Sequence, residues 1–189
     1  MLDYTPDKVI FRHYDTIDHD VYDRKFITGT IHNGSKANLK RWAMLNGLLN
    51  IMEDEDGLQG GRSLHVSYGS TKPGCNKRIA QMQYHPWLIV PPEELSVFIM
   101  PVRGNLFRHR VGFIIDSEWL KNRIRSIKKS YGLLDENIYN PHITVSVGTK
   151  IPAKLSKPNF AIVIIGEQTL PYVTKHVQEE ISNRTSAYA

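Results

Sequence analysis

Two short segments of the chain carry the same alternation of apolar and polar residues. They cover residues 63–69 and 141–148, and in each a histidine, one apolar residue and a hydroxyl residue follow one another. Side chains in a β-strand point alternately to opposite faces, so positions two apart share a face. We therefore expect two strands that each point an imidazole and a hydroxyl to one side and their apolar residues into a core.

The first half of the chain has a strand and a helix ahead of its motif. The pattern at residues 26–31 is typical of a strand, and residues 33–35 (Asn-Gly-Ser) favour the start of a helix. Apolar residues then recur, many of them three or four positions apart, as far as Met52, which predicts an amphipathic helix of about four turns. Glycines between residues 57 and 61 separate this helix from the first motif.

The second half repeats this order. Residues 110–115 are typical of a strand, Ser117 can cap the helix that follows, and Gly132 can end it. The apolar stripe of that helix consists of Leu120, Ile124, Ile127 and Tyr131. Further strands are expected at residues 95–100 and 160–165, and the second is so apolar that burial on both faces is expected.

Together these elements predict a single α+β domain over residues 1–189. We expect a bilobal fold of two duplicated strand–helix–strand units with pseudo-twofold symmetry, whose central antiparallel sheets carry the motifs and form an active-site cleft. Lobe one would cover about residues 25–70 and lobe two about residues 95–170. A connecting segment of about residues 70–94 would join them, long enough to act as a lid.

The composition is that of a soluble globular protein. Hydrophobic residues make up 41% and charged residues 23% of the chain. No apolar run approaches the ~20 residues that span a bilayer, and the start of the chain lacks a secretory signal. We therefore expect a cytoplasmic protein with no membrane partner, and we infer no protein partner. The net charge of +5 suits an anionic ligand such as a nucleotide.

Two histidines that face one phosphate can supply acid–base chemistry. Cleavage of a phosphodiester needs a base for the attacking oxygen and an acid for the departing one, and histidine can be either near neutral pH. His65 and His142 are therefore the candidate catalytic pair. The hydroxyls of Ser67 and Thr144 can donate hydrogen bonds to the non-bridging oxygens. This scheme requires no metal and no other cofactor.

The segments Leu64-His65-Val66-Ser67 and Pro141-His142-Ile143-Thr144 resemble the paired His-x-Thr/Ser signatures of the 2H phosphoesterase superfamily, over about residues 25–166. Within it, residues 111–147 look most like the phage anti-CBASS phosphodiesterases. The resemblance implies a metal-independent enzyme that hydrolyses 3′-5′ bonds of cyclic di- and trinucleotide immune signals, in the host cytoplasm if the chain is phage-encoded. Ser67 stands where Thr is more usual, so the hydroxyl is kept and a methyl group is lost.

A cyclic oligonucleotide would also need rings for its bases and cations for its other phosphates. Stacking is worth about 1–3 kcal/mol per base. The aromatic candidates are Tyr84, Trp87 and Tyr139. The cationic candidates, which follow the first motif, are Lys72, Lys77 and Arg78. In a regular strand Tyr68 points away from His65, so we expect it in the core.

Two other functions remain open from the residues alone. The same site could act on RNA ends, as a 2′,3′-cyclic phosphodiesterase or an RNA-ligase-like enzyme. The chain could also hold a cyclic nucleotide as a non-catalytic sponge. Two groups poised to exchange protons favour catalysis, because binding alone is better served by permanent cations.

Overall fold

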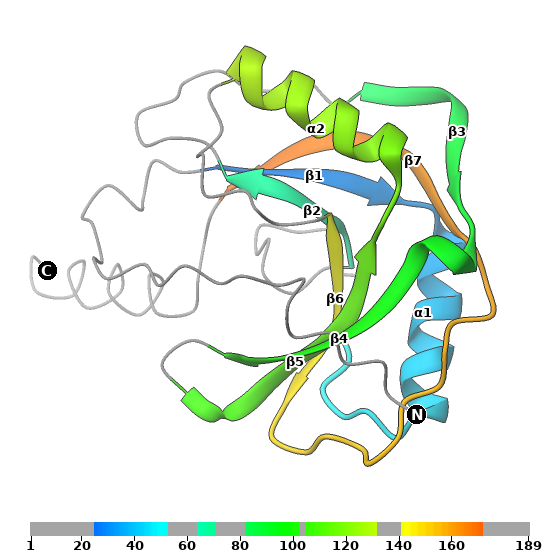
Figure 1. Ribbon diagram of the computed structural model, residues 1–189, viewed down its shortest axis with the longest axis vertical. Coiled ribbons are helices and arrows are strands. Elements are labelled where there is room, and N and C mark those ends of the chain that lie inside the picture. Colours follow the sequence, from blue (N-terminus) through cyan, green and yellow to red (C-terminus); the bar gives the residue numbers. More distant parts are fainter. Residues whose placement is uncertain (1–24, 53–63, 71–81, 103–104, 132–140, 172–189) are drawn as a thin grey trace, which may run out of the picture.

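The chain folds as a mixed α+β structure, as the sequence predicts (Figure 1). The computed structural model describes residues 25–52, 64–70, 82–102, 105–131 and 141–171. Its strands are β1 (Lys25–Ile31), β2 (Val66–Ser70), β3 (Met82–Val90), β4 (Leu95–Val102), β5 (Asn105–Ile115), β6 (His142–Gly148) and β7 (Ile162–Pro171). Its α-helices are α1 (Asn33–Leu45) and α2 (Glu118–Tyr131), and a 3-10 turn (Pro92–Glu94) precedes β4. Neither described α-helix has the length and apolar character of a membrane span.

The strands form one antiparallel sheet of seven strands in the order β3-β7-β1-β2-β6-β5-β4. β4 and β5 pair along their length, from Leu95 opposite Ile115 to Val102 opposite Asn105. By contrast, β2 and β6 meet at one pair, Ser67 opposite His142. In Figure 1, β1, β2 and β7 run across the view while β4, β5 and β6 run down it. The sheet therefore turns where β2 meets β6, and its two halves join at the two motifs.

Helix α1 begins and ends at clear local signals. The Nδ1 atom of His32 caps its start by accepting a hydrogen bond from the Gly34 N–H at 3.1 Å. At its end Gly47 has a φ of 68°, and the N–H groups after Asn46 turn back to the last carbonyls of the helix. The expectation that the helix continues to Met52 is therefore wrong, because this left-handed glycine ends it at Leu45.

Helix α2 follows the expected pattern. The Oγ atom of Ser117 accepts a hydrogen bond from the Leu120 N–H at 3.5 Å, which confirms Ser117 as the capping residue. Leu120, Ile124 and Ile127 are buried, so these three residues of the predicted apolar stripe face the core. The side chain of Tyr131 lies outside the described residues.

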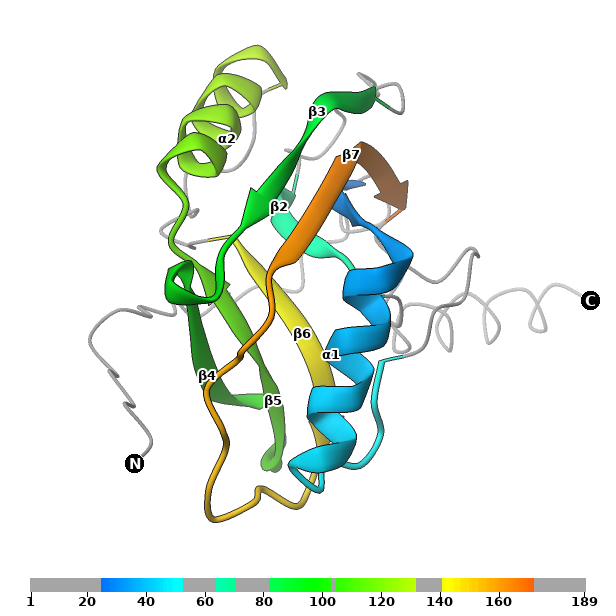
Figure 2. The same ribbon diagram turned by 90° about the vertical axis from the view of Figure 1, so that its right-hand side faces the viewer.

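The two helices cover different parts of the sheet (Figures 1 and 2). On α1, the ring of Trp42 lies 4.5 Å from that of Phe113 on β5. On α2, the ring of Trp119 lies 5.2 Å from that of Tyr84 on β3. Each helix thus packs on strands far from it in sequence, and the buried residues form one core that joins both halves of the sheet.

The segment expected to connect two lobes contains a strand. Residues 82–90 form β3, which pairs with β7 at one edge of the sheet. Pro86 lies within it, where the register to β7 shifts between Gln83 and Leu88. An edge strand tolerates proline because one side of its backbone need not pair. β5 and β7 also extend beyond their predicted bounds, to Asn105 and Pro171.

Candidate functional site

The first motif alternates between core and open face, as a strand should. Leu64, Val66 and Tyr68 are buried, which confirms the core position expected for Tyr68. His65 and Ser67, which lie between them, are partly exposed. The imidazole and the hydroxyl therefore share the face of β2 that points away from the core.

The second motif follows the same rule. Ile143 and Val145 on β6 are fully buried. His142 and Thr144 are partly exposed and lie on the opposite face. Each motif thus presents a histidine and a hydroxyl on the open side of its strand.

The pairing of β2 with β6 brings these four side chains together. Ser67 stands opposite His142, and directly opposed residues of an antiparallel pair lie on one face with Cβ atoms about 4.5–5.5 Å apart. The bridge is confined to this pair, and His65 lies two residues before Ser67 along the chain. The histidines are then diagonal neighbours, about 7–8 Å apart between backbone positions. The two motif strands do lie side by side, as the sequence predicts.

A buried aromatic ring, that of Phe98, borders His142 on the face that carries the motifs. The ring of Phe98 on β4 lies edge-on to the His142 imidazole, with centroids 5.9 Å apart and planes at 84°. Phe98 pairs with Gly112, which in turn pairs with Thr144. A Cβ atom on Gly112 would lie 3.0 Å from the Phe98 ring and would overlap the carbonyl oxygen of Ile143. Glycine at this position therefore lets the ring lie across the strand toward His142.

On the other side of β2, strand β1 adds two threonines to the same face. Thr28 pairs with Ser67 and donates a hydrogen bond to the carbonyl of Gln168 at 3.5 Å. Gly29 pairs with Val66, so Thr30 comes next to His65. The Thr30 Oγ1 atom is buried and has no hydrogen-bond partner in the described part of the chain. A buried hydroxyl without a partner is costly and uncommon.

Beneath the open face, a buried polar network supports β2 from the core side. Glu167 on β7 is fully buried and accepts two hydrogen bonds from Arg123 on α2, one of them from Nε at 3.0 Å. The Tyr84 hydroxyl donates to the Glu167 Oε2 atom at 2.5 Å and lies 3.2 Å from the hydroxyl of Tyr68. Tyr68 directly follows Ser67, so this network links the first motif to β3, β7 and α2.

The network also fixes the protonation of its members. Burial, and then the hydrogen bond to Glu167, raise the pKa of Tyr84 above its ordinary value. Burial, and then the neighbouring Tyr84, raise the pKa of Tyr68. The hydrogen bond to Glu167 raises the pKa of Arg123. The phenols therefore stay neutral donors and the guanidinium stays charged at neutral pH.

The expected substrate-binding residues have different outcomes. Tyr84 does not fit the stacking role, because its ring is only 7% exposed and its hydroxyl belongs to the network. Trp87 is 49% exposed on the edge strand β3, with its ring 5.0 Å from that of His32. The remaining candidates lie outside the described residues, and they are Lys72, Lys77, Arg78 and Tyr139.

Sequence reasoning missed Phe98, Thr28 and Thr30 as site residues. The two threonines had a signal, since they alternate with Ile27 and Ile31 in the same way as the motif residues alternate with their neighbours. Phe98 lies in a nearly continuous apolar run, where alternation does not separate the two faces.

Comparison with known proteins assigns no family to this chain. No family model matches it, and no curated protein matches its sequence. The described residues also contain no group of three or more His, Cys, Asp or Glu side chains arranged to hold a metal ion. The function therefore has to be argued from the chemistry of the site.

Proposed function

We propose that the protein is a phosphodiesterase that works by acid–base catalysis with two histidines and needs no metal. The observation that carries this proposal is the pairing of Ser67 with His142, which sets both motifs on one face of adjoining strands. His65 and His142 are the catalytic pair. Ser67 and Thr144 are the hydroxyls that bind the phosphate.

The proposed reaction is the hydrolysis of a phosphodiester. One neutral histidine takes a proton from the attacking water while the water oxygen bonds to phosphorus. The other histidine, protonated, gives its proton to the ribose oxygen as the bond from that oxygen to phosphorus breaks. The products are a phosphate monoester and an alcohol, and the two histidines regain their starting states by exchange of a proton with solvent.

The diagonal placement of the histidines supports this scheme. A separation of about 7–8 Å between backbone positions leaves room for one phosphate between two imidazoles. Attack and departure occur in line, on opposite sides of phosphorus, so the base and the acid have to flank it. Hydroxyls beside each imidazole can then donate to the non-bridging oxygens, where negative charge is concentrated.

The order of elements supports the bilobal interpretation. The units β1–α1–β2 and β5–α2–β6 both have the order strand, helix, strand. In the sheet, β2 and β6 are neighbours, and β1 and β5 lie on their outer sides. We propose that the two units are copies related by an approximate twofold axis between β2 and β6. Each copy would then contribute one histidine and one hydroxyl.

The proposed substrates are cyclic di- and trinucleotides with 3′-5′ bonds. Two observations support this class: the resemblance of the paired motifs and the net charge of +5. Trp87 lies on β3, which β7 and β1 separate from β2, so its ring carries no part of the proposal. An RNA 2′,3′-cyclic end and a nucleotide that is bound but not cut are the alternatives that the test separates.

The test is a panel of phosphodiesters incubated with the protein in excess chelator and resolved by chromatography. The panel holds cyclic dinucleotides, cyclic trinucleotides, 2′,3′-cyclic mononucleotides and an RNA that ends in a 2′,3′-cyclic phosphate. Cleavage of the cyclic oligonucleotides to linear products is expected. Cleavage of the 2′,3′-cyclic substrates alone would move the function to RNA ends, and tight binding without any cleavage would make the protein a sponge.

A further inference from the structure

The open face of β5 carries an arginine that the proposed chemistry does not use. Alternate residues of 111–115 are buried in the core, so Arg110 and Gly112 lie on the opposite face. Gly112 pairs with Thr144, and Arg110 pairs with Val147. Arg110 therefore lies on the motif face of the sheet, two residues along β5 from the row that holds the Thr144 hydroxyl.

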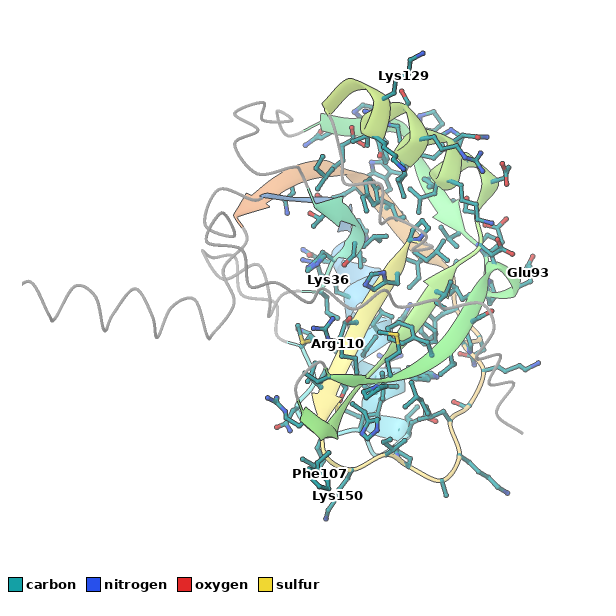
Figure 3. All side chains as sticks on the ribbon, turned by 60° about the vertical axis from the view of Figure 1, so that its left-hand side comes forward. Lys36, Glu93, Phe107, Arg110, Lys129 and Lys150 are labelled. Atoms are coloured by element: carbon teal, nitrogen blue, oxygen red, sulfur yellow. The ribbon has the colours of Figure 1, made fainter. Side chains whose placement is uncertain are left out.

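Arg110 is exposed on the surface of β5. Within the described residues it makes no ion pair or hydrogen bond, whereas Arg123 is paired with Glu167 and Arg125 with Glu118. An arginine in this position keeps its charge and its donors for a ligand. Figure 3 labels Arg110 beside β6, the strand that carries the second motif.

The distance from Arg110 to the motifs suits a neighbouring phosphate. Two residues of strand span about 7 Å, which an extended arginine side chain covers. Gly112 itself has no side chain, and the Phe98 ring of β4 lies over it, so the guanidinium would reach the Thr144 row along the edge of that ring. A guanidinium binds phosphate with two parallel hydrogen bonds, and it holds its charge at every physiological pH.

We propose that Arg110 binds a second phosphate of the substrate, one that does not react. This inference rests on the proposed function and narrows it, because it selects substrates with at least two phosphates. A cyclic oligonucleotide has them, and a cyclic mononucleotide does not. Arg110 would thus determine specificity without taking part in proton transfer.

Binding of two nucleotides tests the subsite separately from catalysis. The His142→Ala protein serves as the parent, and Arg110→Gln and Arg110→Lys are each added to it. Calorimetry would measure the Kd of a cyclic dinucleotide and of a cyclic mononucleotide for all three proteins. Arg125→Gln is the matched control, because it removes an exposed arginine on α2, whose ion pair with Glu118 spans 3.4 Å. Arg110→Gln should weaken dinucleotide binding roughly tenfold or more and leave mononucleotide binding unchanged. The Kd of the dinucleotide for Arg110→Lys should lie between those of Arg110→Gln and the His142→Ala parent. Arg125→Gln should bind both nucleotides as the parent does.

Each other result has a distinct meaning. If Arg110→Gln weakened the binding of both nucleotides equally, or of neither, the proposed subsite would be wrong. The proposed phosphodiesterase activity would be unaffected by that result. The expected pattern in a protein whose unmutated form cuts no phosphodiester would keep the subsite and overturn the catalytic proposal. Failure of the parent to bind either nucleotide would overturn both.

Discussion

Ser67 on β2 and His142 on β6 stand opposite each other at the pair that joins these two strands. The hydroxyl of the first motif therefore lies beside the histidine of the second. The candidate site thus draws on both motifs, at the contact between the two halves of the sheet.

The buried network should make a large contribution to stability. Arg123→Leu leaves the fully buried carboxylate of Glu167 without its cation, so the free energy of unfolding should fall by about 3 kcal/mol in urea denaturation. Arg125→Leu, which breaks a pair that is exposed on both sides, should change it little. Equal losses in the two variants would show that the network is no stronger than a surface ion pair.

The buried phenols predict a loss of stability at alkaline pH. In the unfolded chain Tyr68 and Tyr84 lose their protons near the ordinary value of 10.0, whereas burial raises the pKa of each in the folded chain. The stabilising effect is complete below pH 10 and is lost as pH rises toward the folded pKa, with a slope of about 1.4 kcal/mol per pH unit for each phenol. Unfolding curves from pH 9 to 11 should give Tyr84→Phe a shallower decline than the wild type. An unchanged slope would contradict the burial of a neutral Tyr84.

Gly112→Ala should disturb the site and the fold together. The added methyl group would meet the backbone carbonyl of Ile143 and the ring of Phe98, and the carbonyl cannot move without shifting β5 against β6. A loss of about 1–3 kcal/mol in unfolding free energy is expected, together with lower turnover. Ser96→Ala, at an exposed position on β4, should change neither quantity. A fully stable and active Gly112→Ala would mean that the Phe98 ring does not need this space.

The rate should depend on pH in a bell-shaped curve. One histidine has to be neutral while the other is protonated, so turnover should fall on both sides of an optimum. His65→Ala and His142→Ala should each lose the limb that belongs to the missing group. If a single variant kept both limbs of the profile, the limb expected to disappear with its missing histidine would belong to another residue.

Much of the site could be predicted from alternation alone. Ser67, His142 and Thr144 lie in short strands where polar and apolar residues alternate, and His65 directly precedes β2 in the same alternation. Their common direction within each motif therefore follows from local geometry. The same rule predicts that Tyr68 lies in the core, and it does.

The remainder depends on contacts between distant segments. Glu167 lies 44 residues from Arg123 and 83 from Tyr84, so no local pattern could link them. The sequence therefore predicts an available ring at Tyr84, whereas tertiary contacts bury it. β3 was missed because Pro86 and polar neighbours suggest a loop, and only its edge position beside β7 makes the strand possible.

The central claim is that His65 and His142 act as one acid–base pair on a phosphodiester. The most direct test is the turnover, in excess chelator, of a substrate that the wild type cuts, measured for His65→Ala, His142→Ala and the double variant. Each single variant should lose roughly 10²–10⁴-fold. The double variant should lose far less than the product of the two, because the pair works as a unit. Full turnover by the double variant, or a wild-type rate that disappears with chelator and returns with zinc or manganese, would contradict the account.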